Sequence, residues 1–155
     1  PAGAPVTAYE VNSTSKRIAE IVYPHIEIYQ KPFESLFFAG YIPLKDEFQK
    51  ADFQLVIGNP PYGTFSGKWA GMGEKQWTGA IEYDQYFITR GLDLLVKDGL
   101  LIFIIPSSFL QNGAKYNGIK EKIAAKAQLI DAYRLPQRAF ATTDIGTDIV
   151  VFRKR

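Results

Sequence analysis

The chain has 155 residues, of which 46% are hydrophobic and 22% are charged, a balance that is ordinary for a globular domain. It contains no cysteine and one histidine, which excludes a disulfide scaffold, a thiolate nucleophile and a cysteine-based zinc site. The formal net charge of +2 is small, so any contact with nucleic acid has to come from local basic patches. No apolar run reaches 18 residues, so we expect no membrane partner.

Strands and helices are expected to alternate along most of the chain. The expected strands are residues 6–11, 25–29, 53–57 and 100–105, and the expected helices are residues 14–23, 44–50, 82–97 and 115–127. Two further strands, 129–135 and 148–152, follow with no helix between them. The alternation predicts an α/β fold with a mostly parallel, doubly wound sheet, and the final pair predicts an antiparallel hairpin at its edge.

Residues 63–80 are expected to form a long loop that contains five glycines. A loop of this length inside a compact domain is more often functional than idle. It interleaves basic and aromatic side chains, Lys68 and Trp69 followed by Lys75 and Trp77. Two interpretations remain open, a grip on a splayed nucleic-acid substrate and a cover over a partner domain.

The most informative stretch is Asn59-Pro60-Pro61-Tyr62, which follows the expected strand 53–57. Two prolines fix φ near −65° and remove two N–H donors, and a residue before proline is turned away from helical backbone angles. The result is a stiff loop at the carboxyl end of a strand, where open α/β sheets bind their ligands. An ordinary turn needs only some of these residues, so we favour a ligand site.

These four residues resemble the Asp/Asn/Ser-Pro-Pro-aromatic signature of amino-group methyltransferases that use S-adenosylmethionine, especially the DNA adenine N6-methyltransferases. The expected order of elements is similar to the Rossmann-like class I methyltransferase fold. Two later segments, Ile104–Leu110 and Phe140–Val151, resemble those beside the target-base pocket in the restriction-modification branch. The resemblance implies methylation of the N6 amine of a flipped-out adenine in double-stranded DNA, in the bacterial cytoplasm.

The resemblance also implies a role for individual residues. Cofactor contacts fall on Glu10, for the ribose hydroxyls, on Phe33 and Glu34, for the adenine, and on Asn59. Glu34 departs from the family, which usually has Asp there. The implied catalytic residues are Asn59, Pro60, Pro61 and Tyr62, and the implied substrate contacts are Tyr62, Phe140, Ser107, Trp69 and Lys68. Acceptors on Asn59 and Pro60 would serve the target amine, so this chemistry requires no metal.

Residues 1–155 are interpreted as a single methyltransferase domain that is partial, because the family's first strand and Gly-rich turn should precede Glu10 by about 20 residues. We therefore expect a truncated amino end, and a separate target-recognition domain or subunit with a nuclease or helicase partner. Two alternatives stay open. One is a protein glutamine N5-methyltransferase of the release-factor type, which shares Asn-Pro-Pro-Tyr. The other is a non-catalytic module that binds DNA or a partner.

Overall fold

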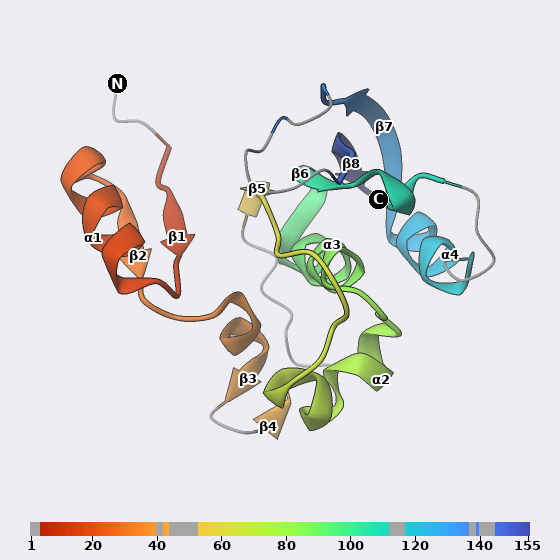
Figure 1. Ribbon diagram of the computed structural model, residues 1–155, viewed down its shortest axis with the longest axis horizontal. Helices are drawn as coiled ribbons and strands as arrows, with labels where there is room; N and C mark the ends of the chain where they lie inside the picture. Colours follow the sequence, from red (N-terminus) through yellow and green to blue (C-terminus); the bar gives the residue numbers. More distant parts are fainter. Residues whose placement is uncertain (1–3, 40–41, 44–52, 112–116, 137–138, 140–144) are drawn as a thin grey trace. The chain divides into compact units, whose positions relative to one another are not determined.

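The computed structural model describes residues 4–39, 42–43, 53–111, 117–136, 139 and 145–155. It divides into two compact units, Pro1–Lys45 and Asp46–Arg155, which are described separately below (Figure 1). The helix expected over residues 44–50 lies outside the described residues.

The first unit begins with a parallel β-α-β arrangement. Strands β1 (Thr7–Tyr9) and β2 (Glu27–Tyr29) pair in parallel, and helix α1 (Ser13–Val22) connects them. Asn12 caps the helix, because its side-chain oxygen accepts the backbone N–H of Ser15 at 3.0 Å. The strands are shorter than expected, and the helix ends one residue earlier.

The rest of this unit consists of short elements. A 3₁₀ helix, η1 (Phe33–Phe37), follows β2 and leads directly into β3 (Phe38–Ala39). Strand β3 pairs antiparallel with β4 (Ile42–Pro43). The ring of Phe37 is fully buried and meets Phe33 edge to face, with centroids 5.3 Å apart, so η1 carries the aromatic core of this part.

The second unit contains a four-stranded sheet. Its strands are β5 (Phe53–Gly58), β6 (Leu95–Pro106), β7 (Ala127–Arg134) and β8 (Thr147–Lys154), in the order β5-β6-β8-β7. Strands β5 and β6 are parallel, whereas β8 runs antiparallel to both β6 and β7. The predicted antiparallel pair of final strands is therefore confirmed, with β7 at the edge and β8 inside the sheet.

One face of this sheet carries the hydrophobic core. Helices α3 (Tyr83–Leu94) and α4 (Asn117–Lys126) contribute the buried residues Ile88, Leu92, Ile119 and Ile123. The sheet contributes the buried side chains of Leu101, Phe103, Ile105, Val150 and Phe152. Burial of a side chain of this size is worth about 1.5–3 kcal/mol, so each member of this cluster stabilises the unit.

The opposite face of the sheet is also apolar. Alternate residues of three neighbouring strands point to it, as the pairs Ile57–Ile102, Ile102–Val151 and Ile104–Ile149 show. Ile57 is 72% exposed and the others are half-buried, because α3 and α4 both lie on the core face. Strand β6 is therefore apolar on both faces, and the helices α3 and α4 cover only the core face.

Helix α3 ends earlier than expected, and β6 begins earlier. The expected helix reaches Lys97, but the observed helix ends at Leu94. Leu95, which has the spacing of a helical core residue, is instead a buried strand residue opposite Phe53. A bulge follows, in which Asp98 has φ of +64°, and regular pairing resumes at Leu100. Helical and strand spacing coincide at Leu95, which explains the wrong boundary.

Residues 66–80, called here the tryptophan segment, are more ordered than the expected loop. The segment contains the π-helical turn η2 (Ala70–Glu74), kinked at Gly73, and the short helix α2 (Lys75–Thr78). The residues on either side of the segment pair with each other. Thr64 forms an antiparallel bridge with Glu82. On either side of this bridge, Phe65 N–H donates to the Ile81 carbonyl (2.8 Å) and Tyr83 N–H donates to the Gly63 carbonyl (2.9 Å).

A buried ion pair holds the middle of the tryptophan segment on α3. The guanidinium of Arg90 donates to both carboxylate oxygens of Glu74, at 2.8 and 2.5 Å, and both residues are at most 1% exposed. Burial opposes the charge of Arg90, but the hydrogen bonds that Arg90 donates to Glu74 and the negative charges of Glu74 and Asp93 more than offset it, so the pKa of Arg90 is raised. Asp93 also binds Lys126 of α4 at 2.6 Å.

The close approach of α3 to β6 makes Gly91 sensitive to substitution. A Cβ at this position would lie 2.6 Å from Leu101 Cδ1, inside van der Waals contact. We expect Gly91→Val to lower the free energy of unfolding by about 1–3 kcal/mol, measured by urea titration. The matched control is Gly118→Val in α4, where nothing lies within 4 Å, and it should change stability by less than about 0.5 kcal/mol. Equal losses in both variants would contradict this packing.

The buried ion pair makes a second prediction. Arg90→Met leaves the Glu74 carboxylate buried without its bidentate partner, and we expect a loss of about 3–5 kcal/mol in unfolding free energy. The double variant Glu74→Met/Arg90→Met removes both charges and should recover most of that loss. Lys16→Met, which breaks the exposed pair with Glu20, is the control and should cost less than about 0.5 kcal/mol. A double variant no more stable than Arg90→Met would refute the interpretation.

Candidate functional site

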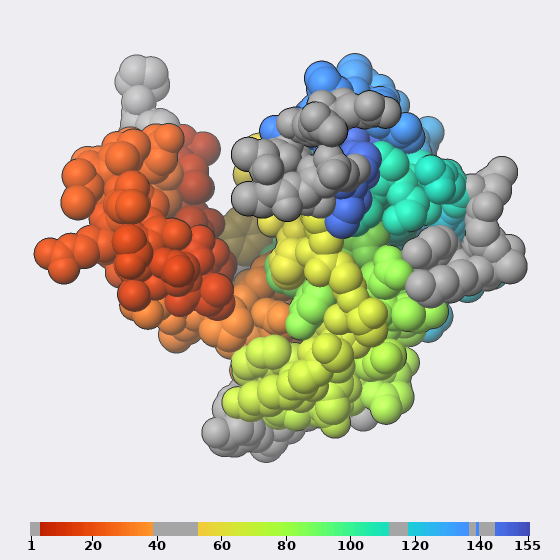
Figure 2. Space-filling view, in the orientation of Figure 1, coloured from red at the N-terminus to blue at the C-terminus, as the bar shows by residue number. Residues whose placement is uncertain are grey.

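The Asn-Pro-Pro-Tyr motif leaves the carboxyl end of β5. Gly58 is the last residue of the strand and pairs with Phe103 of the parallel strand β6. Asn59 is exposed, Pro60 is buried and Tyr62 is half-buried. In the space-filling view the yellow segment that contains the motif lies at the surface (Figure 2). The motif therefore presents the Asn59 amide to solvent from an anchored strand end.

Asn59 and Tyr62 contact each other directly. The Tyr62 hydroxyl donates a hydrogen bond to Oδ1 of Asn59 at 3.0 Å. The two side chains stand three residues apart, with the prolines between them, so the fixed φ of each proline shapes the turn that brings them together. Within the motif, the Tyr62 phenol and the Asn59 carboxamide are thus linked by a hydrogen bond.

Tyr62 is in turn held by the start of α3. Gly63, which follows it, has φ of +106°, a backbone conformation that favours glycine, and its carbonyl accepts the N–H of Tyr83. Asp84, the second residue of α3, is near enough for its charge to act on the Tyr62 phenol. Burial and the negative charge of Asp84 both raise the pKa of the Tyr62 phenol.

Ser107 follows the carboxyl end of β6, at the same edge of the sheet as Asn59, because β5 and β6 are parallel. It lies in the 3₁₀ turn η3 (Ser107–Phe109), and its backbone N–H donates to Gly146 at 2.8 Å. The side chain is 6% exposed, and within the described part of the chain its hydroxyl has no hydrogen-bond partner. The sequence-based prediction of a substrate contact at Ser107 therefore remains a prediction, on a buried hydroxyl.

Three of the predicted cofactor contacts, Glu10, Phe33 and Glu34, belong to the first unit. Glu10 directly follows β1, and Phe33 and Glu34 follow the parallel strand β2, so they occupy the same edge of that small sheet. The carboxylate of Glu10 accepts the backbone N–H of Asn12 at 2.7 Å through one oxygen. Glu34 is 9% exposed. Because Asn59 is in the other unit, their joint role in one cofactor site remains a prediction.

The other predicted substrate contacts differ in their exposure and in the side chains that they contact. Lys68 is exposed, with its ammonium 4.8 Å from the centroid of the half-buried Trp69 ring, a cation–π arrangement. Trp77 is 41% exposed, and its ring lies 6.0 Å from the Arg90 guanidinium. Phe140, expected to stack on the target base, lies outside the described residues.

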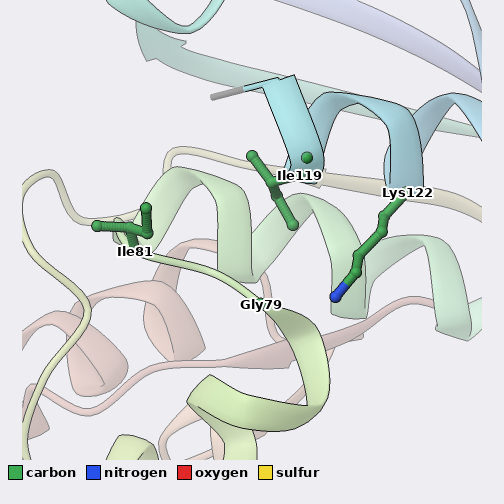
Figure 3. Close-up of a pocket in the computed structure, with 5 residues that line it drawn as sticks. Gly79, Ile81, Ile119 and Lys122 are labelled. Carbon is green, nitrogen blue, oxygen red and sulfur yellow. The ribbon is translucent and has the colours of Figure 1, made fainter. Parts of the chain in front are cut away.

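A separate shallow pocket of about 220 Å³ lies between the α2–α3 connection and α4 (Figure 3). It is lined by Gly79, Ile81, Gly118, Ile119 and Lys122, and the Lys122 side chain reaches toward Gly79. The motif residues do not line it. Its walls carry one ionisable group and no other charged side chain, so it offers little for recognition of a polar substrate.

Sequence reasoning missed two features of the site. Asp84 is 1% exposed beside Tyr62, although an acidic residue in the first turn of a helix usually faces solvent. The Glu74–Arg90 pair joins residues 16 positions apart, and no periodicity signals such a pair. The described residues hold no cluster of three potential metal ligands, and among their helices none is long and apolar enough to span a bilayer.

Two curated proteins are similar to the chain. It is 29% identical over 156 residues to the defense against restriction protein B of Escherichia phage P1, covering 99% of the chain and 6% of that protein. It is 30% identical over 135 residues to a putative type II restriction enzyme and methyltransferase of Methanocaldococcus jannaschii, covering 85% of the chain and 11% of that protein. The chain thus spans a small part of each relative.

Solved structures share the fold. A modification subunit of a putative type I restriction enzyme from Vibrio vulnificus YJ016 superposes with a TM-score of 0.74 at 21% identity, over 96% of this chain and 32% of that one. An N-methyltransferase, NodS of Bradyrhizobium japonicum WM9 in complex with S-adenosyl-L-homocysteine, gives 0.57 at 13% identity, over 97% and 66%. A putative class I S-adenosylmethionine-dependent methyltransferase of Listeria monocytogenes gives 0.58 at 13% identity, over 99% and 55%.

These similarities confirm the predicted class I methyltransferase fold. The family assignment rests on the sequence itself, which matches the family described as Eco57I restriction-modification methylase over residues 8–140. That match covers the β1 region, the Asn-Pro-Pro-Tyr motif, the tryptophan segment and α4. The chain belongs to the Eco57I restriction-modification methylase family.

Proposed function

We propose that this chain forms part of the catalytic domain of a DNA methyltransferase that methylates the N6 amine of a flipped-out adenine. The observation that carries the proposal is the motif geometry: an exposed Asn59 carboxamide next to the Pro60 carbonyl, at the carboxyl end of β5. Family membership supports a restriction-modification role. The specificity for adenine rests on the motif and on the chemistry described next.

The exocyclic amine of adenine is a weak nucleophile, because its lone pair is delocalised into the ring. It attacks a methyl donor more readily when its two N–H groups are bound by acceptors, since these stabilise the tetrahedral geometry that develops in the transition state. In this proposal Asn59 Oδ1 and the Pro60 carbonyl are those acceptors. Their contribution is preorganised electrostatic stabilisation together with positioning of the amine.

S-adenosylmethionine is the proposed methyl donor, as the resemblance implies. The S-adenosyl-L-homocysteine complex of the structurally similar NodS supports this choice at the level of the fold. Glu10 is chemically suited to the ribose hydroxyls, because it directly follows strand β1 and the hydrogen bond from the Asn12 N–H occupies only one of its carboxylate oxygens. Phe33 and Glu34, on the neighbouring strand's exit, would contact the adenine.

Double-stranded DNA is the proposed substrate, and the target base has to leave the helix to be reached. Tyr62 would stack on one face of the extruded base and Phe140 on the other, which is worth about 1–3 kcal/mol for each ring. Lys68 and Trp69 are proposed to contact the surrounding strand. A target-recognition domain or subunit, and a nuclease or helicase partner, would supply sequence choice and cleavage.

Methyl transfer to DNA tests the proposal directly. In the protein encoded by the complete gene, labelled methyl from S-adenosylmethionine should appear in unmethylated DNA as N6-methyladenine. Release-factor protein serves as the rival acceptor. Label in protein rather than DNA would establish the glutamine methyltransferase instead, and no label in either from a folded protein would favour a non-catalytic binding module.

The two side chains of the motif should fail in different ways. Asn59→Ala is expected to lower kcat by about 10²–10³, because it removes a preorganised transition-state contact. Tyr62→Ala is expected to weaken base capture by about 1–3 kcal/mol, read from 2-aminopurine fluorescence at the target position. Lys97→Ala, at the exposed β6 bulge, is the control and should leave both quantities unchanged. Equal loss of cofactor binding in both motif variants would refute this division.

A further inference from the structure

We propose that the Tyr62 hydroxyl is a positioning group for Asn59, which holds the carboxamide with Oδ1 in a fixed place as an acceptor. This role is distinct from stacking by the Tyr62 ring, and it rests on the proposed function. The signature that the motif resembles requires only an aromatic residue at this position, so a ring without a hydroxyl would satisfy stacking. The hydroxyl therefore needs an explanation of its own.

The Asn59 side chain needs orientation. It is exposed, and the Tyr62 hydroxyl at 3.0 Å is the one hydrogen-bond partner of its amide within the described residues. The terminal torsion of asparagine is broad and roughly two-fold, so rotation by half a turn exchanges oxygen and nitrogen at nearly the same positions. With the nitrogen in the place of the oxygen, the side chain would offer donors to an amine whose own N–H groups also donate. The hydrogen bond that the Tyr62 hydroxyl donates to Oδ1 favours the orientation in which the oxygen takes that place.

Tyr62 is fixed strongly enough to serve as that donor. It is half-buried, and the hydrogen bond between Tyr83 N–H and the Gly63 carbonyl ties the next residue to the start of α3. Burial and the charge of the buried Asp84 both raise the pKa of its phenol, so the hydroxyl retains the proton that it donates. A carboxamide oxygen has two lone pairs. One accepts from Tyr62, and the second remains for the target amine.

The test exploits the difference between an amide and a carboxylate. Tyr62→Phe keeps the ring and removes the hydroxyl. With Asn59 present, we expect kcat for adenine methylation to fall about three- to tenfold, the effect of one hydrogen bond, with base capture and KM for DNA unchanged. Asn59→Asp makes both side-chain oxygens acceptors, so adding Tyr62→Phe to it should change kcat by less than about twofold.

Two further measurements separate this role from a structural one. Tyr83→Phe removes a neighbouring phenol, which donates to the Ser66 carbonyl at 3.3 Å, and should leave kcat unchanged. A neutron crystal structure of Tyr62→Phe, in which the deuterated amide nitrogen is distinguished from the oxygen, should show the Asn59 carboxamide in more than one orientation. This second readout decides the matter even where Asn59→Asp is too slow to assay.

Several results would overturn the proposal. They are an unchanged kcat in Tyr62→Phe, an equal loss in the Asn59→Asp background, a loss explained by weaker base capture, and a single undisturbed Asn59 orientation in the neutron structure of the variant. The wild-type protein and Asn59→Ala report separately on the proposed function. If the first methylates adenine and the second does not, while Tyr62→Phe equals wild type, only the positioning role fails.

Discussion

The parallel pairing of β5 with β6 is the contact on which the candidate site depends. Strand β6 lies in the middle of the sheet, with Leu101, Phe103 and Ile105 in the core beneath α3 and α4. By pairing Gly58 with Phe103, it fixes the point at which the chain leaves β5. The prolines then remove the freedom of the next turn. The position of Asn59 thus follows from the packing of a strand that carries none of the motif.

The other side of the motif is fixed by a different means. The chain that leaves Tyr62 returns to α3 after the tryptophan segment, and the bridge between Thr64 and Glu82 closes that excursion. A closed segment of this kind could still move about its two ends. The Glu74–Arg90 pair prevents this, because separating the two charges would leave both buried without compensation. An ion pair in this place adds geometric definition more than net stability.

The elements that could be predicted from sequence are those set by local patterns. Alternating strands and helices, the motif at the end of β5 and the antiparallel β7–β8 pair all follow from periodicity and proline chemistry. The end of α3 could not be predicted, because Leu95 fits helical spacing and strand burial equally well. The burial of Asp84 and the pairing of Glu74 with Arg90 depend on tertiary contacts 16 or more residues apart, which no local pattern records.

The two proposed acceptors pose different physical problems. The Pro60 carbonyl belongs to a backbone whose direction is set by the strand before it and the proline ring after it, so its orientation needs no further support. The Asn59 carboxamide is at the end of a rotatable side chain, and a half-turn of this group exchanges its oxygen and nitrogen with little change in shape. A rigid backbone alone cannot choose between the two orientations of the amide, whereas a hydrogen bond donated to Oδ1 favours one of them. Tyr62 is held by Gly63, by α3 and by half-burial, and it carries its hydroxyl to within 3.0 Å of Asn59 Oδ1. The orientation of the exposed Asn59 amide is therefore restrained by its hydrogen bond with a tyrosine that the fold holds in place.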